Sequence, residues 1–244
     1  MEEIKNKIAL VTGASRGIGK AIALALADEG IHVAVNYHNK KEQADEVCKL
    51  IQTKGVKALA VQADVSETKQ VAAMIDTIEK ELGEINILVN NAGISIRRKI
   101  EETTEEDFDE MIKTNLKSSF LVTQAVLPNM RKNKWGRIVM ISSVAAQTGG
   151  AIGLHYASSK AGQLGLMHFY ARYLAQEGIT ANAIAPAIIE TDMIAQLGGL
   201  TPSNIPVGRF GKPEEIAEAA VLLVKNGYIT GQTINVNGGW HPST

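Results

Sequence analysis

The sequence predicts one α/β domain built on a doubly wound parallel sheet with helices on both faces. Short apolar runs alternate with longer helical patterns along all 244 residues, and no linker, repeat or low-complexity segment interrupts them. The apolar runs are continuous, as at 8–11 and 87–89, which is typical of parallel strands covered on both faces. Strict alternation of strand and helix, with right-handed crossovers, gives this architecture.

The same runs set the order of the elements. We expect seven strands, at 7–12, 32–36, 58–62, 85–90, 137–142, 180–185 and 233–236. Helices are expected at 17–29, 40–53, 67–82, 104–131, 155–177 and 213–225. Residues 192–212 are rich in Gly and Pro, which predicts a short substrate loop rather than core. We therefore interpret residues 1–244 as a single domain.

Composition narrows the possible partners. With 25 basic and 26 acidic residues the net charge is −1, so no overall field favours nucleic acid or an anionic membrane. The chain has one cysteine, Cys48, which excludes an intrachain disulfide and favours a reducing compartment. No apolar run is long enough to span a membrane, and the five His are scattered, so no metal site is predicted. We expect a cytoplasmic protein.

The first turn from strand to helix, at 12–19, carries the first chemical signal. Its glycines, Gly13, Gly17 and Gly19, let the backbone turn tightly, approach a pyrophosphate and pack the helix on the sheet. The helix that follows offers free N–H groups to an anion. The residues between the glycines, Ser15, Arg16 and Ile18, are expected to line the same site. A purely structural turn is the alternative, but the position after the first strand favours a dinucleotide.

The end of the second strand bears on which dinucleotide binds. An acidic side chain there usually holds the ribose 2′-hydroxyl of NAD, but residues 35–40 contain no Asp or Glu. Asn36 stands there instead, and Arg16 supplies a cation for a 2′-phosphate. These residues favour NADP(H) over NAD(H). The alternative is that Arg16 is a solvated loop residue and that both cofactors are accepted.

Two further stretches follow the ends of strands. Asp64 and Val65 come after the third strand, where an adenine could bind, although a plain helix cap would look the same. Asn91, Ala92 and Gly93 follow the fourth strand. Their short side chains allow the backbone to approach a ligand, and they would serve an ordinary turn equally well.

Asn115 and Ser143 are candidate functional residues for different reasons. Asn115 lies inside the predicted helix 104–131, where its side chain competes for backbone hydrogen bonds. That misfit indicates either a function or a buried, hydrogen-bonded Asn. Ser143 follows the fifth strand, 13 residues before Tyr156. The carboxyl ends of parallel strands face the ligand crevice, so Ser143 is expected to reach the same space as Tyr156.

Tyr156 and Lys160 are four residues apart, so on a helix they share one face. A fixed ammonium stabilises phenolate and lowers the pKa of the Tyr, which makes the phenol a proton donor for reduction of a carbonyl. The spacing alone is weak evidence, because Tyr37 and Lys41 repeat it. The assignment depends on the residues around the pair.

In this order and spacing, the motifs resemble the classical short-chain dehydrogenase/reductase family over essentially the whole chain; they lie at 12–19, 64–65, 90–93, 115, 143, 156–160 and 186–191. Within the family the chain is most similar to the 3-oxoacyl-[acyl-carrier-protein] reductases, on residues 10–19, 89–94, 189–193, 228–231 and 236–239. The resemblance implies a Rossmann-like NAD(P)-binding domain, a homotetramer, and NADPH-dependent reduction of a β-ketoacyl thioester in fatty acid biosynthesis.

The resemblance also implies roles for individual residues. Tyr156 would be the acid and Ser143 would hold the substrate oxygen. Lys160 would hold the nicotinamide ribose and lower the pKa of Tyr156, and Asn115 would anchor a water in a proton relay. The cofactor-binding residues implied or predicted are Gly13, Ser15, Arg16, Gly17, Ile18, Gly19, Asn36, Asp64, Val65, Asn91, Ala92, Gly93, Tyr156, Lys160, Pro186, Ile189 and Thr191.

The substrate stays open because the chain departs from the family pattern. Ala187 follows Pro186 where Gly is usual, and the 192–212 loop is shorter than in typical carrier-protein reductases. Glu177 stands where those enzymes often place an Arg to meet the acidic carrier, whereas the basic Lys134 is retained. An acyl carrier protein is therefore an open partner. The alternatives are a carrier-independent alcohol, sugar or steroid-type dehydrogenase and, more remotely, a non-catalytic dinucleotide sensor.

Overall fold

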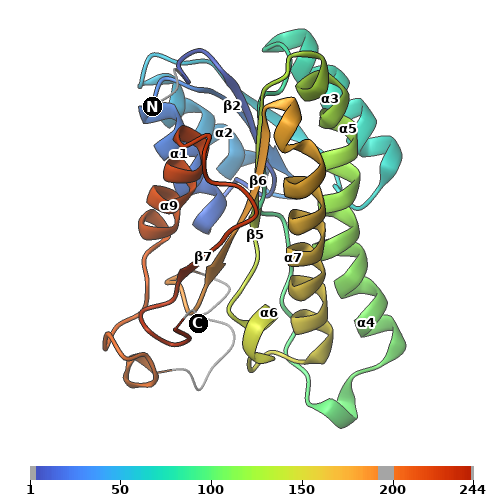
Figure 1. The fold of residues 1–244 in the computed structure, drawn as a ribbon, viewed down its shortest axis with the longest axis vertical. Coiled ribbons are helices and arrows are strands. Elements are labelled where there is room, and N and C mark those ends of the chain that lie inside the picture. Colours follow the sequence, from blue (N-terminus) through green and yellow to red (C-terminus); the bar gives the residue numbers. More distant parts are fainter. Residues whose placement is uncertain (1–3, 192–200, 243–244) are drawn as a thin grey trace.

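A single parallel sheet forms the centre of the protein, as a computed structural model that describes residues 4–191 and 201–242 shows (Figure 1). Within those residues, seven strands pair in the order β3-β2-β1-β4-β5-β6-β7, and every pairing is parallel. They are β1 (Ile8–Val11), β2 (His32–Tyr37), β3 (Ala58–Gln62), β4 (Ile87–Asn90), β5 (Gly136–Ile141), β6 (Ile179–Pro186) and β7 (Thr233–Val236). The predicted doubly wound sheet is confirmed.

Helices cover both faces of the sheet. One face carries α1 (Gly17–Asp28), α2 (Lys41–Gln52) and α9 (Pro213–Lys225), and the other carries α3 (Thr68–Glu81), α5 (Ser118–Lys132) and α7 (Leu154–Leu174) (Figure 1). Successive side chains of a strand point to opposite faces. In β1, Ala9 and Val11 accordingly pack with the α1, α2 and α9 side, and Ile8 and Leu10 pack with the other side. Both faces of β1, β4 and β5 are buried, which explains their largely apolar sequence.

The helix predicted at 104–131 is three segments rather than one. A short α4 (Glu105–Met111) passes into a π-helical segment, η2 (Ile112–Lys117), before α5 begins. A π segment inserts one residue into the helical turn and is often found at functional sites. Asn115 lies within it and is fully buried. The misfit of Asn115 with a regular helix is thus a real break in the helix.

The other differences concern boundaries. The helix predicted at 155–177 ends at Leu174 and tightens into a 3-10 turn, η3 (Ala175–Glu177), because Gly178 adopts φ +74 and ends it. One short helix, α6 (Ala145–Thr148), was not predicted, since four residues carry no periodic signal. Short 3-10 turns also occur at η1 (Ile100–Glu102) and η4 (Pro202–Asn204). Residues 192–200 of the predicted substrate loop lie outside the described residues.

The sheet places the functional motifs at one edge. Strand order reverses on either side of β1, which lies between β2 and β4, and ligands of open α/β sheets bind at such a switch point, beyond the carboxyl ends of the strands. The turns after β1, β4 and β5 therefore converge there. Among the residues that the structure describes, no helix is both long and apolar enough to cross a membrane.

Candidate active site

A cleft of about 670 Å³ lies at the carboxyl edge of the sheet. Every predicted cofactor residue lines it, from Gly13 in the first turn to Thr191 after β6, and so do Ser143, Tyr156 and Lys160. Asn115 does not line the cleft; it lies buried behind it. The tertiary structure thus brings together residues that are up to 178 positions apart in the sequence (13 to 191).

The glycine-rich turn has the conformation that an anion site needs. Gly13 and Gly17 have φ of +61 and +56, values that side-chain-bearing residues rarely adopt. Arg16 is the N-cap residue of α1, in an extended conformation, and its side chain does not cap the helix. The N-terminal N–H groups of α1 are therefore not capped by that side chain, as is required of a helix end that binds phosphate.

Asn36 and Asn91 hold this turn in place from two neighbouring strands. The Asn36 Oδ1 atom accepts a hydrogen bond from the Gly13 N–H at 3.1 Å, while its amide donates to the Ala63 carbonyl. The Asn91 amide donates to the carbonyls of Thr12 and Gly13 at 2.9 and 3.1 Å. Both side chains are thus engaged in positioning the backbone that lines the cleft.

Thr12 is a positioning residue that was not singled out by its sequence. Its hydroxyl accepts hydrogen bonds from the N–H groups of Asn91 and Ala92, both at 2.9 Å, and joins the end of β1 to the loop after β4. A Cβ on Gly19 would lie 2.5 Å from the Asn91 amide nitrogen, so only glycine fits there. The end of β1, the start of α1 and the loop after β4 are therefore closely packed.

Asp64 lines the cleft, but its carboxylate also serves a local turn. Its Oδ1 atom accepts hydrogen bonds from the Ser66 N–H and hydroxyl at 2.9 and 2.7 Å. Burial raises the pKa of Asp64, but the bonds with Ser66 and the nearby charges of His38 and Lys113 outweigh it and leave the pKa below its usual range. A carboxylate held in this way stays ionised at neutral pH.

At the other end of the cleft, α7 presents Tyr156 and Lys160 on one face. Ser143, which follows β5, lines the same cleft, and its side chain favours ionisation of the Tyr156 hydroxyl and so lowers its pKa. The Lys160 Nζ atom donates to the Ile141 carbonyl at 2.8 Å and lies 5.8 Å from the centre of the Tyr156 ring. The Ser142 hydroxyl donates to the Lys160 carbonyl at 2.9 Å. These bonds lock α7 to the end of β5.

Burial governs the ionisation of this pair. It raises the pKa of the Tyr156 hydroxyl above its usual range, an effect that the Ser143 side chain opposes. It also lowers the pKa of the Lys160 ammonium to about 8. Burial outweighs the effect expected from the spacing with Lys160, whose ammonium is directed at the Ile141 carbonyl, so the pKa of Tyr156 lies above its usual range rather than below it.

Asn115 joins the loop after β4 to α7. Its Oδ1 atom accepts a hydrogen bond from the Ile94 N–H at 2.8 Å, and its amide donates to the Ile94 carbonyl at 3.0 Å and to the Ser159 hydroxyl at 3.1 Å. A Cβ on Gly93 would lie 3.0 Å from Asn115 Oδ1 and 3.6 Å from Lys160 Nζ. Both side chains therefore lie close to Gly93.

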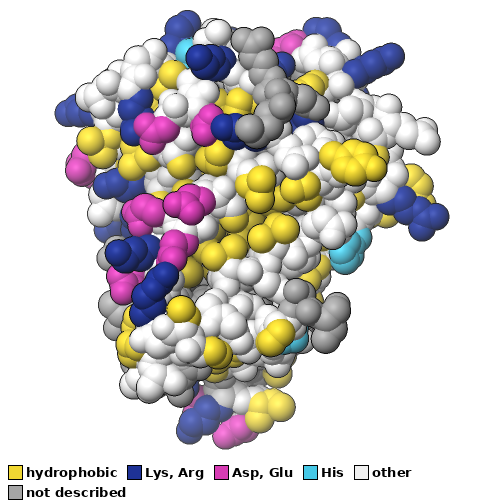
Figure 2. Space-filling view, turned by 60° about the vertical axis from the view of Figure 1, so that its left-hand side comes forward, with side chains coloured by type: hydrophobic (Ala, Val, Ile, Leu, Met, Phe, Trp, Pro, Cys, Tyr) yellow, Lys and Arg dark blue, Asp and Glu magenta, His cyan; other side chains and the backbone are white. Residues whose placement is uncertain are grey.

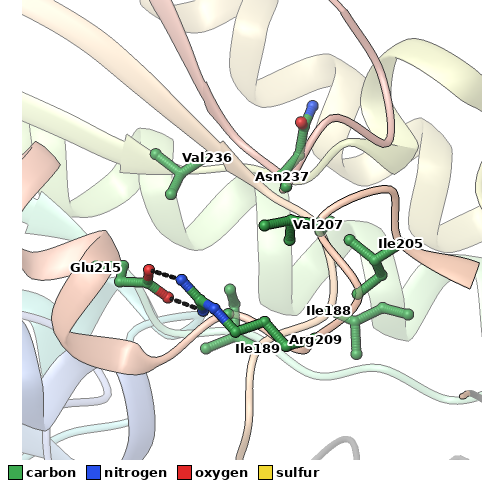
Figure 3. A pocket seen from close by; sticks show the side chains of 11 residues that line it. Ile188, Ile189, Ile205, Val207, Arg209, Glu215, Val236 and Asn237 are labelled. Carbon is green, nitrogen blue, oxygen red and sulfur yellow. Dashed lines mark hydrogen bonds and ion pairs between the residues drawn. The ribbon is translucent and has the colours of Figure 1, made fainter. Parts of the chain in front are cut away.

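A second, smaller pocket of about 100 Å³ lies beside the segment after β6 (Figure 3). The Arg209 guanidinium forms two hydrogen bonds with the Glu215 carboxylate, at 2.8 and 2.6 Å, across one side of it (Figure 3). The Glu190 N–H donates to the Gly211 carbonyl at 2.8 Å. These contacts join the segment that precedes residues 192–200 to the segment that follows them.

Residues near Tyr156 that sequence motifs did not reveal are mostly apolar. Ile94, Ile152 and Ile188 line the cleft, and an aliphatic side chain that faces a ligand has the same sequence signal as one in the core. Trp240 also lines the cleft. Of these residues it alone stands out in the sequence, as a large aromatic side chain near the C-terminus. In the described part of the chain, no group of three or more His, Cys, Asp or Glu side chains could hold a metal.

Comparison with known proteins agrees with this geometry. A family model described as short chain dehydrogenase matches residues 7–199. The 3-oxoacyl-[acyl-carrier-protein] reductase FabG of Staphylococcus aureus (strain Mu50) is 44% identical over 241 residues, which cover 96% of this chain and 98% of that one. The 3-oxoacyl-[acyl-carrier-protein] reductase of Synechocystis is 43% identical over 243 residues and 98% of each chain.

A solved structure extends the comparison to three dimensions. The crystal structure of a candidate short-chain alcohol dehydrogenase from Sinorhizobium meliloti 1021 superposes with a TM-score of 0.90 at 36% identity, over 98% of this chain and 97% of that one. Sequence, fold and the arrangement of the cleft agree. The chain belongs to the short chain dehydrogenase family of oxidoreductases.

Proposed function

We propose that the protein reduces a 3-oxoacyl thioester to the 3-hydroxyacyl thioester with NADPH. The observation that carries the proposal is that the buried Tyr156 side chain lies in the same cleft as Ser143, Lys160 and the glycine-rich turn. The names of the Staphylococcus and Synechocystis relatives, which are similar over nearly their whole length, support the substrate class.

The cleft fits a nicotinamide dinucleotide. Gly13 and Gly17 adopt positive φ and the α1 N-terminus has no side-chain cap, which suits a pyrophosphate. Residues of the turn would hold the pyrophosphate, Asp64 and Val65 the adenine end, and Lys160 the nicotinamide ribose. When bound, the cofactor supplies the hydride. A complete set of Ser143, Tyr156 and Lys160 argues against a non-catalytic sensor, which has no need of a proton donor.

The preference for NADPH is supported by charge at the 2′-phosphate end. Arg16, His38 and Lys40 line that part of the cleft, and β2 ends without an acidic residue. A guanidinium pairs a phosphate with two hydrogen bonds, whereas an acid at the end of β2 would repel it. We therefore propose NADP(H) as the working cofactor.

The residues of this chain have complementary roles in the reduction. The Ser143 hydroxyl donates a hydrogen bond to the carbonyl oxygen, which becomes more basic as the carbonyl carbon is reduced. Tyr156 transfers its proton to that oxygen, so the product is an alcohol and the side chain is left as phenolate. Lys160, charged below its pKa of about 8, stabilises the phenolate. Burial keeps Tyr156 protonated until that step.

The surface positions considered for carrier docking lie away from the cleft. Lys134 precedes β5 and Glu177 precedes β6, so both lie at the amino edge of the sheet. The Glu177 carboxylate is paired with Arg131 at 2.9 Å, which neutralises the unfavourable charge. Nearer the cleft, Arg98 donates its backbone N–H to the Ile152 carbonyl, and its guanidinium is paired with Asp107. We propose that an acyl carrier protein delivers the thioester at the carboxyl edge of the sheet, because the cleft that holds Tyr156 lies there.

NADPH oxidation tests the proposal directly. Acetoacetyl thioesters should be reduced faster than free ketones, diketones or keto-sugars. Tyr156→Phe should lower kcat by about 10²–10⁴-fold, the usual contribution of a general acid, while NADPH binding, followed by fluorescence, changes little. Activity on free ketones alone would favour the second candidate, a carrier-independent dehydrogenase, which the Sinorhizobium structure supports. Near-normal turnover of the Phe variant would refute the role of Tyr156.

We further propose a cytoplasmic homotetramer. Phe120 of α5 and Phe169 and Tyr173 of α7 are 43%, 60% and 57% exposed, which leaves aromatic surface uncovered on one face of the monomer. Figure 2 shows hydrophobic side chains on the face that carries α9 and β7, where Leu222 is 48% exposed. Two apolar faces suit a particle with two kinds of interface. Light scattering coupled to size exclusion tests it, and a monomer at micromolar concentration would contradict it.

A further inference from the structure

Gln163 is a buried amide on the helix that carries the proton donor. It lies three residues after Lys160 on α7 and has no exposed surface. Its Nε2 atom donates to the Asn115 carbonyl at 3.0 Å and to the Ser119 hydroxyl at 2.8 Å. The Ser119 hydroxyl in turn donates to the same Asn115 carbonyl at 3.1 Å. Two donors therefore meet one carbonyl, and a carbonyl oxygen has two lone pairs.

The other atom of this amide shows that Gln163 does not serve packing alone. Its Oε1 atom is buried and has no hydrogen-bond partner among the described residues. An unpaired buried acceptor is unfavourable, and an apolar side chain of similar size would avoid it. What Gln163 contributes therefore lies in the two bonds that its Nε2 atom donates.

The carbonyl that Gln163 holds belongs to the residue that bridges two walls of the site. Asn115 lies in the π segment, where the helical hydrogen-bond pattern is irregular. Through its side chain it bonds Ile94, in the loop beside Gly93, and Ser159, the residue before Lys160. A shift of the Asn115 backbone would move both contacts at once.

We propose that Gln163 is a positioning residue for the reduction: its amide holds the Asn115 carbonyl and so fixes the Asn115 side chain between the loop after β4 and α7. This rests on the proposed function, because the reduction requires Lys160 to be aligned with that loop. The Asn115 side chain thus joins the loop after β4 to α7.

Gln163→Met tests the role, because Met keeps the length of the side chain and removes the donor. Gln124→Met is the matched control: Gln124 of α5 donates to the Tyr170 hydroxyl of α7 at 3.0 Å, so it joins the same two helices without contacting Asn115. We expect Gln163→Met to lower kcat about tenfold and to displace its pH dependence, with the KM for NADPH within about twofold of the wild type. The control should leave all three unchanged.

Hydrogen exchange gives a readout that does not depend on activity. The Ile94 N–H is bonded to Asn115 Oδ1, so the peptide that contains it should take up deuterium faster in Gln163→Met and not in Gln124→Met. Unchanged kcat and exchange in Gln163→Met, or equal effects in both variants, would overturn the inference. If the wild type reduces no carbonyl compound while exchange at Ile94 still responds only to Gln163→Met, the proposed function fails but the positioning of Asn115 by Gln163 is supported.

Discussion

Replacing Lys160 with Met should stabilise the protein without cofactor at neutral pH while it removes turnover. Burial lowers the pKa of Lys160 from 10.5 to about 8, so the folded state holds the charged ammonium less readily than the unfolded chain does. Each pH unit between the two pKa values carries about 1.4 kcal/mol, which makes the penalty about 3 kcal/mol. Met fills a similar volume without a charge to bury.

The pH window follows from the sign of this shift. The penalty is fully present below pH 8, and it is relieved as the pH rises to about 10.5, because the folded protein then loses the Lys160 proton first. Removing the bond from Nζ to the Ile141 carbonyl costs about 1–2 kcal/mol at every pH. Lys160→Met should therefore be about 1–2 kcal/mol more stable at pH 7, and that advantage should fall by about 3 kcal/mol towards pH 10.5.

Urea unfolding at fixed protein concentration, followed by circular dichroism from pH 7 to 10.5, measures the difference. Lys80→Met, which removes an exposed lysine from α3, is the control and should give a curve parallel to the wild type. Parallel curves for Lys160→Met as well would show that burial does not perturb Lys160, and would refute the reasoning. NADPH oxidation by Lys160→Met should fall to background.

Two further substitutions test the geometry of the cleft. Gly93→Ala should lower kcat/KM by roughly tenfold, because its Cβ would lie 3.0 Å from Asn115 Oδ1 and 3.6 Å from Lys160 Nζ. Steady-state kinetics measures the change, and wild-type values would show that the loop can move without affecting the site. Arg16→Leu should weaken NADPH binding about tenfold or more and leave NADH binding nearly unchanged, since only NADPH carries the 2′-phosphate; fluorescence titration of both cofactors measures this, and equal losses would contradict the assignment.

Much of the fold could be predicted because each strand carries its own signal. The buried runs at 8–11 and 87–89 are apolar on both faces, and that pattern alone indicates a parallel sheet with helices on either side. Boundaries were less predictable. Where α7 gives way to the 3-10 turn η3, and where the chain enters the π segment, depend on backbone angles that helical periodicity does not reveal.

The cleft was partly predictable for a similar reason. Gly13 and Gly17 stand where the backbone requires positive φ, so their residue type is itself evidence. The apolar lining of Ile94, Ile152 and Ile188 has no such signature. The positions of Lys134 and Glu177, at the edge of the sheet away from the cleft, follow from their places just before β5 and β6, which the sequence already indicates.

The sequence by itself determined the doubly wound sheet, the glycine-rich turn and the spacing of Tyr156 and Lys160, because these depend on local propensity and helical periodicity. Only the tertiary structure showed that burial raises the pKa of Tyr156 and lowers that of Lys160, since burial is a property of the packed site and not of the spacing. It alone also showed Gln163 at the Asn115 carbonyl, a contact between residues 48 positions apart. Local sequence patterns therefore identify the candidate residues, and packing determines their ionisation and their contacts.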